Sequence, residues 1–289
     1  MKTVVSLLSL LAISLTGFSQ VLDPGESPLD GVYSKSMHNA NREPIPYVHL
    51  READLMWLKR VWRMVDMEEK MNQVFYYPKD PAQGRKNFIT ILMEAITESG
   101  NITAYAAEDE SGNPNDMFTI PMTPEEIKED VLSYSSTISI TDPNTGQPMD
   151  STVYTDIEYN QIKRFKIKEE VFFDKQRSVL EFRILGIAPM VPAYNSNGEL
   201  VNVQEGFWVY FPEARRVLAQ AEVYNRHNDV HRLTYDDIFM KRMFSSKIVK
   251  ESNVYDRSLE QYLSPLDALL EAEKIEDKIF RFEHDLWSF

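Results

Sequence analysis

Residues Lys166–Phe211 read KIKEEVFFDKQRSVLEFRILGIAPMVPAYNSNGELVNVQEGFWVYF. Apart from Glu169, apolar side chains alternate with other residues along Ile167–Phe173 and again along Leu180–Ile184, and the polar link Asp174–Arg177 separates the two runs. A period of two with β-branched and aromatic residues predicts half-buried strands. Because the link is short, we expect the two strands to pair antiparallel.

A third run, Phe207–Phe211, is apolar on both faces, which predicts a strand covered on both sides. Asn197-Gly198 tolerates positive φ angles and predicts a tight turn before it. The sequence therefore predicts an antiparallel meander sheet over about 160–211, packed with helices and followed by a helical C-terminal region. Helices and strands follow one another without regular alternation, so the expected class is α+β.

Two segments before the sheet have the apolar spacing of helices. In Glu52–Asn72 the spacing is three and four residues, which predicts a long amphipathic helix carried by Leu55, Leu58, Val61, Trp62 and Val65. Arg85–Ser99 predicts a second helix, and Gly100 stands at the position of a C-terminal cap. Thr123-Pro124 with Glu126 has the pattern of a helix start with a capping box.

The C-terminal region begins with a helix that Pro212-Glu213 opens and that runs to about Gln220. Caps at Thr234 and Ser264 start two more helices. The last is the longest, and its expected buried stripe consists of Leu266, Leu269, Leu270, Ile275, Ile279, Phe282 and Leu286. The chain ends on Trp287 and Phe289, which predicts a terminus docked on its own body or, as the alternative, on a partner.

Composition limits the class of protein. The chain has 289 residues, of which 43% are hydrophobic and 26% charged, as in ordinary globular proteins of one or two domains. Its net charge of −14 disfavours binding to nucleic acid and to anionic lipid surfaces. The absence of cysteine excludes disulfides, thiol nucleophiles, thiolate metal sites and lipid attachment through an N-terminal cysteine.

Residues 1–19 have the layout of a cleaved signal peptide. Lys2 is followed by the apolar run VVSLLSLLAISL and by Gly17-Phe18-Ser19, so we expect cleavage near Ser19-Gln20. The alternative is an uncleaved anchor, but the run is shorter than the roughly 20 residues that span a bilayer. Removing Lys2 with this segment changes the net charge from −14 to −15.

We divide the rest of the chain into three parts. Residues 20–47 form an extended proline-rich arm, which we expect to be mobile or to lie along a neighbouring molecule. Residues 48–160 form an N-terminal α+β part. Residues 161–289 hold the sheet and the C-terminal helices, and the last two parts can also form one continuous domain.

No catalytic or cofactor-binding residues are predicted, because the sequence has no nucleophile elbow, Walker loop or dinucleotide fingerprint. His227 and His231 are weak metal candidates, since two histidines four residues apart meet on one helix face. Asn228-Asp229 and the cap at Thr234 indicate a loop instead, and a third ligand is not evident. We therefore predict no metal.

Candidate partner residues come from charge and aromatic placement. Arg60 and Arg63 are basic residues on the polar side of the predicted Glu52–Asn72 helix, which is either a solvated face or a docking site. Trp57 is offset from the apolar stripe and is either an interface anchor or a core residue. Arg215 and Arg216 belong to Phe207–Arg257, with nine basic and seven acidic residues, whereas the following Ser258–Phe289 has three and eight. These charges either join neighbouring copies or neutralise one another within one molecule. Trp287 completes the candidate set.

The sequence resembles the GldN/PorN family of the type IX secretion and gliding machinery. The matching runs are Arg51–Asn72, Ile167–Pro189, Phe207–Asp229, Tyr235–Arg257 and Phe282–Trp287. The resemblance implies a non-enzymatic periplasmic scaffold, peripherally associated with the outer membrane. It also implies a ring formed by copies of the chain with a PorK/GldK-like outer-membrane lipoprotein, contacted by a PorM/GldM-like motor protein. The resemblance brings no catalytic residues with it.

Two other functions are kept as alternatives: an exported metal- or carboxylate-dependent hydrolase, and a periplasmic ligand-binding module. Stoichiometric metal in the purified protein would favour the hydrolase. A deep apolar pocket with converging polar groups would favour the binding module.

Overall fold

The computed structural model describes residues 41–82, 84–141, 148–195, 197–225, 228 and 230–286. The predicted signal peptide, the arm up to residue 40, His227 and Trp287 lie outside these residues. Within them, none of the helices combines the length and the apolar composition needed to cross a membrane.

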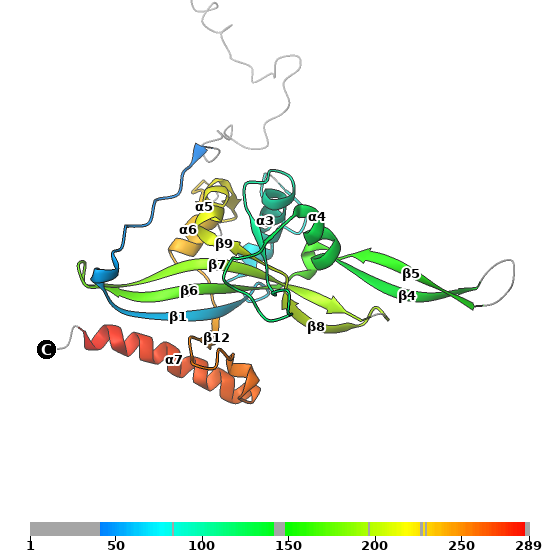
Figure 1. Cartoon of the computed structure of the whole chain (residues 1–289). Coiled ribbons are helices and arrows are strands. Elements are labelled where there is room, and N and C mark those ends of the chain that lie inside the picture. Colours follow the sequence, from blue (N-terminus) through cyan, green and yellow to red (C-terminus); the bar gives the residue numbers. More distant parts are fainter. Residues whose placement is uncertain are drawn as a thin grey trace, which may run out of the picture. The chain divides into compact units, whose positions relative to one another are not determined.

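The centre of the fold is an eight-stranded sheet (Figure 1). Its order is β12-β1-β6-β7-β9-β2-β3, and β8 pairs with β7 beside this path. The strands are β1 (Leu55–Asp66), β2 (Ala104–Ala106), β3 (Pro121–Met122), β6 (Arg164–Asp174), β7 (Val179–Tyr194), β8 (Leu200–Glu205), β9 (Phe207–Tyr210) and β12 (Lys247–Glu251). The predicted antiparallel meander is confirmed, because β6, β7 and β9 are neighbours at its centre.

The prediction of a helix over Glu52–Asn72 is wrong. A single 3-10 turn, η2 (Glu52–Asp54), leads into the twelve-residue strand β1, which pairs with β6 along its whole length and with β12 at its end. Neighbouring residues Val61 and Trp62 are both buried, on opposite faces of the sheet. A strand covered on both faces does not alternate strictly, so its apolar residues fell by chance at helical spacing.

The helices that were predicted from apolar spacing, from an N-terminal proline or from caps are confirmed. They are α3 (Phe88–Thr97), α4 (Pro124–Glu126) with the π-turn η3 (Ile127–Val131), α5 (Phe211–Gln220), α6 (Tyr235–Met240) and α7 (Pro265–Asp285). The Thr123 and Thr234 hydroxyls cap α4 and α6 within capping boxes, and Ser264 caps α7. The shorter elements are α2 (Gln73–Tyr76), η4 (Tyr159–Gln161), η5 (Leu259–Gln261) and the strand pair β10 (Glu222–Val223) and β11 (Leu233–Thr234). β4 (Ser133–Thr141) and β5 (Pro148–Asp156) form a separate hairpin.

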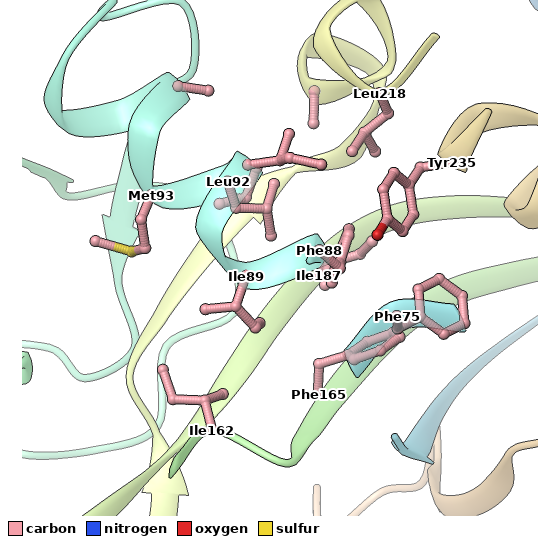
Figure 2. Close-up of a cluster of buried hydrophobic side chains, with 14 of the residues drawn as sticks. Phe75, Phe88, Ile89, Leu92, Met93, Ile162, Phe165, Ile187, Leu218 and Tyr235 are labelled. Carbon is pink, nitrogen blue, oxygen red and sulfur yellow. The ribbon is translucent and has the colours of Figure 1, made fainter. Parts of the chain in front are cut away.

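The largest apolar cluster joins α2, α3, α5 and α6 to one face of the sheet. Figure 2 shows Phe88 and Leu92 of α3 pointing toward Leu218 of α5 and Tyr235 of α6. Phe75 contacts four rings, at centroid distances from 5.3 to 6.0 Å. The sequence predicted the apolar faces of α3 and α5, and their meeting point is this aromatic group.

A second cluster lies on the same sheet face, under α7. The register of β1 and β6 places Trp57 and Val61 beside Val171 and Phe173, and all four contribute to it. The predicted stripe of α7 is only partly right: Ile275 and Ile279 are buried, but Leu266, Leu269 and Leu270 are exposed. Ala268 and Ala272 take their place, because small side chains let the helix lie close to β12 and η5.

The opposite sheet face carries a third cluster, around Trp62 and Trp208. The segment from Ala107 to Phe118 covers it. Asp116 fixes this segment, because its carboxylate accepts a 2.7 Å hydrogen bond from the Trp62 indole and lies 3.2 Å from the Lys168 ammonium. Phe118 packs edge-on against Trp208 and fills the space that Gly186 leaves open.

Candidate interaction surfaces

A buried ion cluster occupies the boundary between the first two apolar clusters. Glu169 on β6 is fully buried, and it accepts hydrogen bonds from Arg63 at 2.5 Å and from Arg242 at 2.8 and 3.2 Å. Arg63 also donates to Glu276 on α7 at 2.6 Å. The cluster thus links β1, β6 and the turn after α6 to the C-terminal helix.

The surroundings of Arg63 explain why a guanidinium is tolerated there. Burial alone would lower the pKa of Arg63, but Glu169 and Glu276 outweigh it and hold the pKa above its usual value. A buried charge is accepted only when it is paired and hydrogen-bonded. Arg63, a candidate partner residue from the sequence, therefore has its partners within the chain.

Trp57 and Arg60 lie on opposite faces of β1. Trp57 stacks on Phe282 of α7, with ring centroids 4.5 Å apart, and so belongs to the second cluster. Arg60 pairs across the sheet with Glu170 of β6 at 2.5 Å and remains partly exposed. Both side chains contribute to internal contacts, since the segment that carries them is a strand and not a surface helix.

Arg215 and Arg216 are neighbours on α5 with opposite environments. Arg215 is buried and binds Asp236 of α6 through two hydrogen bonds of 2.8 and 3.3 Å. Arg216 is exposed. Trp287 lies outside the described residues, so among the described candidates Arg216 presents the most accessible charge.

The end of the arm lies on the body of its own molecule. Arg42 pairs with Asp237 at 2.8 Å, and the ring of Tyr47 lies between the guanidinium groups of Arg183 and Arg215, at 4.8 and 4.4 Å. Burial raises the pKa of Tyr47 to about 12. The expectation of an arm laid along a neighbour concerned residues 20–47, and the described part, from residue 41, contacts β7, α5 and α6 of the same chain.

Metal ligands do not converge in the described part of the chain, where no group of three or more histidine, aspartate or glutamate side chains is placed to hold an ion. His231 is exposed, and its backbone N–H donates to the carbonyl of Asn228 at 3.2 Å in a turn. This agrees with the loop expected from the sequence.

The outer side of α7 is an exposed apolar strip, whose three leucines sequence reasoning assigned to the core. Leu266 and Phe280 are 68% and 66% exposed, and Leu269 and Leu270 lie between them on the side away from Ile275. Glu273 and Asp277 stand on this same face, between Leu270 and Phe280, so the outer strip carries negative charge among its apolar side chains. Four large apolar side chains on one face of an acidic helix suit a protein contact better than water.

A second accessible region lies where β7, β8 and the β4–β5 hairpin extend toward the same side of Figure 1. Tyr134 of β4 stacks on Tyr194 of β7, with centroids 4.3 Å apart, so the base of the β4–β5 hairpin meets the turn end of the β7–β8 hairpin. β8 pairs only with β7, and β4 only with β5. Each of these strands therefore has one edge without a strand partner in the described residues.

Comparison with known proteins gives one result. The family model described as "Gliding motility associated protein GldN" matches residues 50–288. None of the curated proteins matches the chain. The match begins just before η2 and ends just after α7, so it takes in every strand and helix named above.

Proposed function

The chain belongs to the family of gliding motility associated proteins GldN, and on that premise we propose that it is a non-enzymatic scaffold of the type IX secretion and gliding machinery. The scaffold works in the periplasm, after cleavage of the signal peptide near Ser19-Gln20, and is associated peripherally with the outer membrane. It forms a ring with a PorK/GldK-like lipoprotein and with copies of itself, and a PorM/GldM-like motor protein contacts that ring.

The observation that carries this proposal is the family match over residues 50–288. The surface of the described residues supports it. The outer strip of α7 offers apolar contact area interspersed with negative charge, and a partner surface with apolar and basic groups would fit it. The open strand edges at the other end of the sheet offer main-chain hydrogen bonds to a protein partner.

Co-purification from envelopes tests the proposal. The tagged chain should bring down a lipoprotein of the outer membrane in constant ratio after mild solubilisation, and imaging of the complex should show a closed ring. A chain recovered alone, with a stoichiometric metal ion or turnover of a small substrate, would refute it and favour the exported hydrolase.

A variant pair localises the contact. Leu266→Ser with Leu270→Ser removes two apolar side chains of the outer strip without touching the buried face of α7. We expect reduced recovery of the lipoprotein or of the motor protein. Val254→Ser is the matched control, because Val254 is 97% exposed but stands outside the strip. Equal recovery with both variants would exclude the strip as a partner surface.

A further inference from the structure

The outer edge of β8 has no proline and one charge, although its ladder with β7 is irregular at Val201. Natural edge strands are usually guarded by charged residues, proline or bulges that prevent pairing with another chain. β8 reads LVNVQE, and its only charge is Glu205 at the end, which is bound to Lys166 and Trp208. Leu200 and Val201 are exposed at this edge, with Val203 next to them.

The backbone of β8 shows which groups are available. Val203 pairs with Pro192, which has no N–H, and the Val203 N–H donates instead to the side chain of Asn202 at 2.8 Å. The Gly206 N–H, three residues on, points to β7 and donates to Pro189. Because N–H directions alternate along a strand, Val203 directs its N–H away from β7, and an added strand would replace the Asn202 side chain as its acceptor. The register shift at Val201 interrupts the alternation beyond that point.

β4 is a strand suited to that edge. It reads SYSSTISIT, without charge, proline or glycine. The Ile157 N–H donates to the Leu132 carbonyl at 2.7 Å, so the alternation of the β4–β5 ladder directs the N–H of Ser135 outward. A two-stranded hairpin is marginally stable alone and gains from a third strand.

The distribution of charge indicates which molecule supplies the strand added to β8. Copies of a chain with a net charge of −14 repel each other over most of their surface. The segments 133–141 and 190–204 contain one charged residue between them, Glu199. Like-charged copies can therefore approach closely here, and each copy has one edge of β8 and one edge of β4 without a strand partner in the described residues.

We propose that the outer edge of β8 receives β4 of a second copy of this chain by antiparallel or parallel strand addition. The contact joins two different surfaces, so it is heterologous and can be repeated from copy to copy. This inference rests on the proposed scaffold function, because it names the surface through which copies meet.

Two proline variants test it in the full chain purified after export. Val203→Pro blocks the outer edge of β8, and Ser135→Pro blocks that of β4. Each removes an outward N–H and spares the internal ladder. We expect each variant alone to self-associate more weakly by about tenfold or more in sedimentation velocity, since one lost main-chain hydrogen bond corresponds to about that factor. Val203→Thr and Ser135→Thr keep the N–H and should behave as wild type.

Mixing the two variants is the decisive measurement. Val203→Pro retains an intact β4 and Ser135→Pro an intact β8, so the mixture should form heterodimers that neither variant forms alone. Circular dichroism and thermal unfolding of each variant verify folding. A wild-type chain that stays monomeric, a proline variant that associates normally, or a mixture that fails to pair would each overturn the proposal.

Other occupants give distinct results. If Val203→Pro abolishes association and Ser135→Pro does not, β8 pairs with β8, and β4 is not the added strand. If wild type is monomeric and Val203→Pro loses the lipoprotein, the edge takes a strand of that partner, which also overturns the proposal. The proposed scaffold function is tested separately: it is refuted if the lipoprotein is absent from wild-type preparations, whatever the result for the proline variants.

Discussion

Replacing Glu169 by alanine should be among the most destabilising single changes in the sheet. Glu169 is fully buried and holds Arg63 and Arg242. Removing one member of a buried charge cluster costs about 3–5 kcal/mol, because the remaining charges lose their partner. Glu276 still pairs with Arg63, and Arg242 is partly exposed, so the lower half of that range applies.

The adjacent residue provides a matched control. Glu170→Ala removes a carboxylate from the same strand, but its partner Arg60 is 40% exposed, and such pairs contribute about 0–1 kcal/mol. For a chain of this size, about 3–4 kcal/mol corresponds to a decrease in melting temperature of about 10 °C, against about 2 °C for the control.

Thermal and urea unfolding, followed by circular dichroism and tryptophan fluorescence, measure the difference. Restoring the carboxylate one methylene shorter, with Glu169→Asp, should recover part of the loss. Equal effects of Glu169→Ala and Glu170→Ala, or a loss below about 1 kcal/mol for the buried site, would refute the assignment of Glu169 as the charge that organises this boundary.

Three further predictions concern the remaining contacts. A Cβ added at Gly186 would lie 2.5 Å from Cζ of Phe118, so Gly186→Ala should lower the free energy of unfolding in urea by about 1–3 kcal/mol. The decrease should be much smaller in a Phe118→Ala background, and an equal decrease in both backgrounds would contradict the clash. Trp57→Ala removes the stack on Phe282, so limited proteolysis should cut α7 sooner than in a Met56→Ala control, and unchanged cleavage would count against this anchor. Tyr47 has a pKa of about 12 in the folded chain and about 10 when unfolded, so the folded state binds more protons between these values and stability should fall as pH rises from about 10 toward 12. Tyr47→Phe should remove that part of the decrease in urea midpoints, and identical slopes for both proteins would disprove it.

Local signals gave the parts of the fold that were predicted correctly. The caps at Thr123, Thr234 and Ser264 depend on contacts within four residues, and the structure has all three. The β6–β7 hairpin was equally predictable, because apolar residues alternate on either side of Asp174–Arg177 with one interruption, at Glu169. These features need no knowledge of what packs over them.

The errors come from elements whose environment is set by distant residues. β1 pairs with β6 and β12, about 100 residues or more away along the chain. Clusters on both faces of the sheet bury it, which removed the alternation that marks a strand. β8 was missed because an exposed edge strand has no buried face to show. The stripe of α7 was misassigned because leucine predicts burial more strongly than alanine, whereas close packing favoured Ala268 and Ala272.

The candidate surface residues show the same division. Arg63 and Arg215 were named as candidate partner residues, and the structure buries both of them against acidic residues on other elements of the same chain. Their partners Glu169 and Asp236 were visible in the sequence only as two acids among 45. Sequence alone does not tell how buried a residue is, so a buried basic residue and one exposed to a partner cannot be distinguished from it.

The length of β7 has a mechanical consequence. This strand runs for 16 residues and is paired with β6 on one side and with β9 and β8 on the other. Tension applied lengthwise to such a strand loads many hydrogen bonds at once, in shear, and does not open them one after another. A molecule held by the tip of β7 would thus resist being pulled apart along the strand.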